Sequence, residues 1–152
     1  MDNKEEIIDF KKHEYLIEQY VILRNSYAEQ LLTSPVNISD TKEWLKLDDV
    51  EIRGIVRDDV LLGVAILYLH RDGEVAFFVK DKNKGTGSKL LKIIEVVSIE
   101  KKIKLIWGWV LKDNLIAQRV FEKSGFLRGS VNERQYKGLI KQGYIYKKYL
   151  TW

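Results

Sequence analysis

The 152-residue sequence contains no cysteine, one proline and two histidines. Without cysteine, the chain cannot form disulfides, thiolate metal sites or a cysteine nucleophile. His13 and His70 are too few for a histidine-rich metal site, so we expect no bound metal. The single proline, Pro35, leaves regular helices and strands largely uninterrupted.

The chain also lacks long apolar runs and a strong excess of charge. No apolar stretch reaches the roughly 20 residues that a membrane-spanning helix needs. The first ten residues, MDNKEEIIDF, lack the basic start and apolar run of a signal peptide, so we expect a cytoplasmic protein that does not associate with membranes. With 26 basic and 22 acidic residues, the net charge of +4 predicts a solvated surface, or alternatively a basic pocket for a small anion. Nucleic acid is not the expected partner, because no RNA-binding pattern of aromatic and basic residues is present.

Apolar residues are numerous enough for one hydrophobic core. They make up 45% of the chain, and a domain of this length buries about 70% of the surface that its unfolded chain exposes. No repeat and no linker rich in glycine, serine or proline divides the sequence. We therefore expect one domain over residues 1–152.

The first half of the chain is predicted to contain helices followed by an antiparallel meander. A short strand is expected at residues 5–10, and apolar spacings of three and four predict a helix over residues 13–32 that is interrupted near Asn25 and Ser26. Ser39 and Asp40 are typical N-cap residues for a short helix ending at residue 45. The next strands are expected at residues 50–56, 60–69 and 74–79, the last two joined by a turn at Arg71-Asp72-Gly73.

The second half is predicted to alternate between helices and strands. The pattern indicates a helix over 88–101, a strand over 103–110, a helix from Asp113 or Asn114 to Ser124, and strands at 126–132 and 144–150 around a basic, glycine-containing segment. Gly125 suits the left-handed position that ends a helix. A strand–helix–strand unit of this length indicates a parallel pair. We expect an α/β fold with a mixed, twisted, mostly antiparallel sheet of six or seven strands flanked by helices.

The segment over residues 77–91 carries the most informative pattern. A strand leads into a loop with Gly85 and Gly87, and the loop opens an amphipathic helix. A helix N-terminus offers unpaired N–H groups and a positive dipole to an anion, and glycine allows close approach to the backbone. Lys82, Lys84 and Lys89 add positive charge. From these residues alone, a phosphate site and an ordinary strand-to-helix turn with solvated lysines are equally good interpretations, and neither the Walker nor the three-glycine dinucleotide motif fits.

Two motifs resemble those of the GNAT acetyltransferase superfamily. The run Lys82-Asn83-Lys84-Gly85-Thr86-Gly87 is similar to its pyrophosphate motif, Gln/Arg-x-x-Gly-x-Gly/Ala. The run from Asn114 to Phe126 resembles its Asn-x-x-Ala-x-x-x-Tyr-x-x-x-Gly-Phe pattern. The similarity covers residues 50–126 well. The sequence departs from the family pattern in Lys82 for Gln or Arg, in a shorter loop before the glycines, and in Phe121, where the family usually has tyrosine.

The resemblance implies the GNAT-type N-acyltransferase fold, with acetyl-CoA as donor and direct transfer of its acetyl group to a primary amine. It implies a sheet that opens between the strands at 74–79 and 103–110, with pantetheine in the opening and pyrophosphate on the amides of residues 83–88. The residues that it implies for donor binding are Phe78, Val79, Lys80, Lys82, Asn83, Lys84, Gly85, Thr86, Gly87, Ser88, Lys89, Asn114 and Phe121.

Candidates for the catalytic base and the acceptor site lie outside these motifs. Direct transfer needs a base to take a proton from the ammonium group of the acceptor. Glu74 is the first candidate and His70 the second, with Glu133 a weaker third. The plainer interpretation of both Glu74 and His70 is an exposed residue at a strand end. For acceptor binding the candidates are Arg24, Asn25 and Trp109, which could instead be a solvated helix end and a core aromatic residue.

The sequence leaves the acceptor and the oligomeric state open. Leu23-Arg24-Asn25, together with the helix start near Ser39, loosely resembles family members that acetylate amino sugars on nucleotides. Amino acids, polyamines, antibiotics and protein N-termini are further alternatives, and a homodimer is another open question. The alternative function is a non-catalytic module that keeps a coenzyme A pocket or binds RNA or protein. Phe121 and the lack of a clear base favour that alternative.

Overall fold

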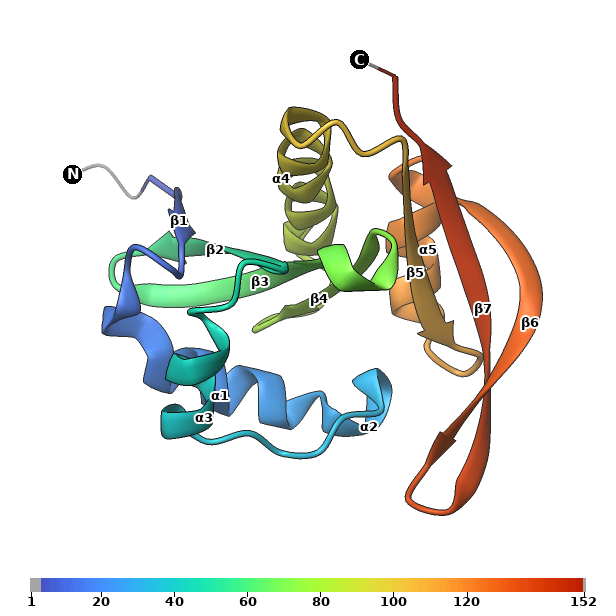
Figure 1. The fold of residues 1–152 in the computed structure, drawn as a ribbon, viewed down its shortest axis with the longest axis horizontal. Helices are drawn as coiled ribbons and strands as arrows, with labels where there is room; N and C mark the ends of the chain where they lie inside the picture. Colours follow the sequence, from blue (N-terminus) through green and yellow to red (C-terminus); the bar gives the residue numbers. More distant parts are fainter. Residues whose placement is uncertain (1–3, 152) are drawn as a thin grey trace.

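The computed structural model describes residues 4–151, which form a seven-stranded sheet in the order β1-β2-β3-β4-β5-β7-β6 (Figure 1). The strands are β1 (Glu6–Asp9), β2 (Val50–Arg57), β3 (Val60–Tyr68), β4 (Glu74–Val79), β5 (Leu105–Leu111), β6 (Leu127–Tyr136) and β7 (Leu139–Tyr149). The helices are α1 (Ile17–Ser26), α2 (Ala28–Leu31), α3 (Ile38–Trp44), α4 (Thr86–Glu100) and α5 (Leu115–Lys123), with 3-10 turns at Glu14–Leu16 and Leu69–Arg71. The expected mixed sheet flanked by helices is confirmed.

The connection from β4 to β5 shapes the middle of the sheet. Every other pair of neighbouring strands is antiparallel, whereas β4 and β5 are parallel and are joined by α4, the crossover that a parallel pair requires. Only Glu74 and Trp107 form a registered pair between these two strands. Beyond that pair β4 and β5 diverge (Figure 1), so the sheet is split at their carboxyl ends.

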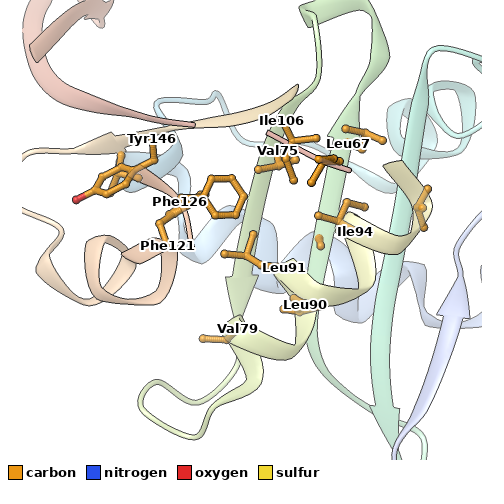
Figure 2. Close-up of a cluster of buried hydrophobic side chains, with 14 of the residues drawn as sticks. Leu67, Val75, Val79, Leu90, Leu91, Ile94, Ile106, Phe121, Phe126 and Tyr146 are labelled. Atoms are coloured by element: carbon orange, nitrogen blue, oxygen red, sulfur yellow. The ribbon is translucent and has the colours of Figure 1, made fainter. Parts of the chain in front are cut away.

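Helices cover both faces of the sheet and build a core on each. α4 and α5 lie on one face, and α1, α2 and α3 lie on the other (Figure 1). The predicted apolar face of α4 is confirmed, because its side chains are buried against β3 and β4: Leu90, Leu91, Ile94 and Val97. Figure 2 shows this cluster continuing from α4 to Phe121, Phe126 and Tyr146 under the other half of the sheet. Burying such side chains stabilises the fold by about 1.5–3 kcal/mol each.

The largest difference from the predicted elements is the final hairpin. The strands expected at 126–132 and 144–150 extend toward each other and leave only a two-residue turn at Lys137 and Gly138. Both turn residues have positive φ, 52° and 76°, as the tightest hairpin turns require. β6 is exposed along most of its length, so it lacks the apolar alternation by which strands are recognised.

The helix caps are partly as predicted. Asn114 caps α5 by accepting a hydrogen bond from the Ala117 N–H at 3.2 Å, and Gly125 follows in the left-handed conformation at φ +89°, both as expected. The predicted N-cap of α3 is wrong: Asn37 caps that helix by accepting from the Asp40 N–H at 2.7 Å. Ser39 and Asp40 belong to its first turn instead. No helix in residues 4–151 has the length and apolar character needed to cross a membrane.

Candidate active site at the split in the sheet

The free edge of β4 forms one wall of the split. The Lys80 N–H donates to the Leu62 carbonyl on β3 at 2.8 Å. Because hydrogen bonding alternates along an antiparallel ladder, the backbone of Phe78 also faces β3, while the backbone groups of Phe77 and Val79 face the split. The carbonyl of Val79 accepts a hydrogen bond there from the Tyr27 hydroxyl at 2.8 Å. An extended ligand could therefore pair with β4 at Phe77 and Val79.

A narrow, mainly apolar cavity fills the split. Residues at the α1–α2 junction line it on one side, and residues at the start of α5 line it on the other. Burial raises the pKa of Tyr27, which lies at this junction, so its hydroxyl stays protonated as the donor to Val79. The lining comprises Tyr27, Gln30, Leu31, Val75, Ala76, Phe77, Phe78, Val79, Lys82, Trp109, Val110, Leu111, Asn114, Ile116, Ala117 and Phe121.

A second cavity of about 260 Å³, with a more polar lining than the first, lies at the N-terminus of α4 and adjoins the first. The two cavities share Phe77, Val79, Lys82 and Ile116. Within residues 4–151, no acceptor pairs with the backbone N–H groups of residues 86–88, so they are open to an anion. The rest of the lining is Asp81, Asn83, Lys84, Gly85, Thr86, Gly87, Ser88, Arg119, Val120 and Lys123.

Gly85 and Gly87 serve different purposes in this loop. Gly85 has φ +78°, and a Cβ there would have no neighbour within 4 Å, so glycine is favoured by its backbone conformation. At Gly87 a Cβ would lie 2.9 Å from Cε2 of Phe77 and 3.1 Å from Cγ1 of Val120. Gly87 therefore lets α4 pack closely against β4 and α5.

The basic residues near the anion site differ from those named by the sequence motif. Lys82 and Lys84 line it, as do Arg119 and Lys123, which lie one turn apart on α5 and were not anticipated. Their four-residue spacing, which places them on one face, is the signal that could have indicated them. Lys89 instead pairs with Glu5 at 2.9 Å.

Lys80 also lies outside both cavities. Its backbone is paired with β3, and its side chain lies beside α1. Phe78 lines the split but is otherwise packed among aromatic rings, 5.9 Å from Tyr20 and 6.1 Å from Tyr27 between centroids. Its ring is thus held by the core on the α1 side.

Phe121 lies at the inner wall of the split, where it is enclosed by other rings. It is only 3% exposed, and its centroid lies 4.9 Å from Phe126 and 5.5 Å from both Phe77 and Tyr146. Its ring tip reaches β5 because Gly108 has no side chain there: a Cβ would lie 2.5 Å from Cζ of Phe121. In Figure 2 the hydroxyl of Tyr146 points away from Val75 on β4, so Tyr146 does not replace the missing phenol at this wall.

The two candidate bases have very different surroundings. The expectation that Glu74 is exposed is wrong: it is 6% exposed and accepts hydrogen bonds from Arg71 at 3.3 Å and Arg134 at 3.0 Å. It lies at the closed end of the split, where β4 still pairs with β5. His70 is exposed, as the plainer interpretation predicts, and its Nδ1 lies 3.5 Å from an oxygen of Asp49.

The candidate acceptor residues lie on the α1–α3 side of the sheet. Trp109 lines the split and is partly exposed, so its interpretation as a core residue is wrong. Arg24 donates to the hydroxyl of Tyr20 at 2.7 Å. The side chain of Asn25 holds the loop before α3, because its amide both donates to and accepts from the backbone of Val36 at 2.9 and 2.8 Å. Residues 4–151 contain no cluster of three or more acidic or histidine side chains that could hold a metal.

Comparison with known proteins identifies the family. Residues 14–126 match the model of the acetyltransferase (GNAT) family, so the chain belongs to that family, whose donor is acetyl-CoA. The chain is similar in fold to the ribosomal-protein-alanine N-acetyltransferase of Brucella melitensis (TM-score 0.83, 16% identity, 95% of this chain and 99% of that chain covered). It is also similar to yncA of Salmonella typhimurium, a putative acetyltransferase with its cofactor acetyl-CoA (TM-score 0.84, 14% identity, 98% and 95% covered).

A third similar structure is spermidine N-acetyltransferase from Vibrio cholerae in complex with CoA and spermine (TM-score 0.80, 13% identity, 97% and 96% covered). At these identities the likeness is one of fold. Comparison with curated proteins by sequence gives no significant match. The acceptor of this chain must therefore be inferred from its own side chains.

Proposed function

We propose that the chain is an N-acetyltransferase that moves the acetyl group of acetyl-CoA directly to a primary amine. The observation that carries this proposal is that the two cavities adjoin and share four lining residues. A narrow apolar slot with free strand backbone groups leads to a polar site at a helix N-terminus. Pantetheine and pyrophosphate need such surroundings in that order.

In this proposal the donor spans both cavities. The pantetheine amides pair with the backbone of Phe77 and Val79, and Asn114 stands at the opposite wall. Near Val79 the pantetheine competes with the Tyr27 hydroxyl for the carbonyl oxygen. The pyrophosphate binds the N–H groups of residues 86–88, and four nearby cations attract it: Lys82, Lys84, Arg119 and Lys123.

The transfer step forms a C–N bond and breaks the C–S bond of the thioester. A base takes a proton from the ammonium group, and the free amine nitrogen then attacks the thioester carbon. Coenzyme A leaves as a thiolate, and the nitrogen loses its second proton to solvent as the amide forms. Backbone N–H groups at the split can stabilise the developing oxyanion. Phe121 offers no proton to the thiolate. Because a thiol has a pKa of about 8.5, the thiolate is a tolerable leaving group without that assistance.

Glu74 is the base that we propose. It lies on the same strand as the free edge and at the end of the split where the acetyl group would meet the acceptor. Its two arginine contacts fix the carboxylate, so proton transfer through a water molecule suits it better than direct contact. His70 is a weaker candidate, because it lies in the connection before β4 and faces Asp49.

The alternative is a module that binds coenzyme A without catalysis, and Phe121 is the observation that favours it. Release of free thiol from acetyl-CoA over a broad panel of amines separates the two functions. We expect thiol release that depends on both the amine and the enzyme, with N-acetylated product confirmed by mass spectrometry. Binding of acetyl-CoA without thiol release from any amine would favour the non-catalytic module.

A further inference from the structure

Three arginines lie on the α1–α3 side of the sheet, and two of them share a single carboxylate. Arg71 and Arg134 each donate to one oxygen of Glu74, which is almost fully buried. Within residues 4–151, no carboxylate pairs with Arg24, and its Nε is buried without a hydrogen-bond partner. A buried donor without a partner costs free energy, and two guanidinium groups on one carboxylate leave an excess of positive charge.

Each of these guanidinium groups lies against an aromatic ring. The Cζ atom of Arg134 is 4.9 Å from the centroid of Trp109, that of Arg71 is 4.3 Å from Tyr68, and that of Arg24 is 5.1 Å from Trp44. Contact with a ring occupies the flat face of a guanidinium group and leaves the N–H groups at its edge. Those edges are the part that binds a carboxylate or phosphate in a bidentate manner.

Arg134 adjoins the proposed site of transfer. Trp109 contacts Arg134 and also lines the split. Ala76 lines the split as well, and it lies on the same face of β4 as Glu74, two residues earlier. An acceptor whose amine reaches the split past Trp109 would therefore place the rest of its structure beside Arg134. A polyamine would place a second ammonium group there and be repelled.

We propose that the acceptor amine carries an acidic group, a carboxylate or a phosphate, that binds Arg134. Arg71 and Arg24 add to the positive potential that attracts it. This inference rests on the proposed acetyl-transfer function and names the class of its substrate. Acetylation of such an acceptor removes its ammonium charge and leaves the acidic group in place.

The test compares acceptors that differ only in the acidic group. The carboxylate arm pairs amino acids with their amides, and the phosphate arm pairs phosphoethanolamine with ethanolamine and glucosamine 6-phosphate with glucosamine. We expect the acidic member to have at least a tenfold higher kcat/KM in one arm, mainly through a lower KM. The arm that shows the difference identifies the acidic group.

Variants at two arginines of β6 locate the effect. Arg134→Gln should remove the preference for the acidic member, and Arg134→Lys should retain part of it, because lysine keeps the charge but not the planar fork. Arg128→Gln is the matched control: Arg128 also lies over a ring, 4.8 Å from the Tyr144 centroid, but Tyr144 packs toward the α4 cluster. The irregularity in β6 between Arg128 and Val131 sets the two arginines on different faces. The control should keep the preference.

Each result bears on one of the two proposals. Equal or faster acetylation of the neutral members, with thiol release intact, would overturn the acidic acceptor while the acetyltransferase function stands. If no amine releases thiol although acetyl-CoA binds, melting scans of the protein with coenzyme A and each matched pair decide. Stabilisation of the protein by the acidic members alone, lost in Arg134→Gln, supports the acidic-acceptor site. The absence of that stabilisation overturns the site. Failure of acetyl-CoA to bind would overturn both proposals.

Discussion

Replacing Gly87 with alanine tests how closely α4 is packed at the start of the proposed anion site. The new Cβ would lie 2.9 Å from Phe77 and 3.1 Å from Val120, closer than normal contacts allow. Overpacking of this kind costs about 1–3 kcal/mol, and the loss of unfolded-state freedom offsets about 0.4–1 kcal/mol of it. The expected net loss is about 1–2 kcal/mol, which lowers Tm by about 2–8 °C in a chain of this length.

Thermal melting measures the stability of Gly87→Ala, and calorimetry measures its affinity for acetyl-CoA. We expect a lower Tm with acetyl-CoA binding retained, because the methyl group points toward Phe77 and Val120. An unchanged Tm with lost binding would refute the reasoning and show that Gly87 serves the approach of the anion. A glutamate at Gly87 would bury a charge, so larger side chains would test folding and not binding.

Three further predictions test the site. Gly85 and Gly138 both have positive φ and open surroundings, so alanine at either should lower stability by about 1 kcal/mol. Only Gly85→Ala should weaken acetyl-CoA binding. Equal affinities of the two variants for acetyl-CoA would place the pyrophosphate elsewhere. Glu74→Gln should lower kcat at least tenfold, which raises the activation barrier by about 1.4 kcal/mol, without changing the affinity for acetyl-CoA. A retained kcat would mean that another residue is the base. Phe121→Tyr should lose about 1–3 kcal/mol of stability, because the added hydroxyl enters a ring cluster that encloses Phe121. Its turnover should be no slower. A tenfold loss of activity in a variant that folds and binds acetyl-CoA would contradict our placement of the thioester sulfur.

Features set by local patterns could be predicted from the sequence. The apolar face of α4, the Asn114 cap and the left-handed Gly125 each depend on residues within a few positions of one another. The hairpin of β6 and β7 escaped prediction because β6 is exposed on both faces and shows no apolar alternation. Its turn at Lys137 and Gly138 was the remaining local signal.

The environment of the site depended on contacts that no local pattern reports. Glu74 follows a turn, which suggested a surface residue. It is buried, and Arg134, 60 residues later in the chain, donates to its carboxylate. The register of β4 against β3 determines whether the backbone groups of Phe77 or those of Phe78 face the split. Tyr27 reaches Val79 from the α1–α2 junction, across 52 positions in the chain.

Thermal melting with and without acetyl-CoA tests the central claim most directly, because the split and the N-terminus of α4 are proposed to hold the donor whatever the acceptor is. At a concentration of one hundred times Kd, a ligand that binds only the folded state adds about 2.7 kcal/mol of stability. For a chain of this length we therefore predict a rise in Tm of about 5–11 °C. A Tm that does not change at saturating acetyl-CoA would contradict the account.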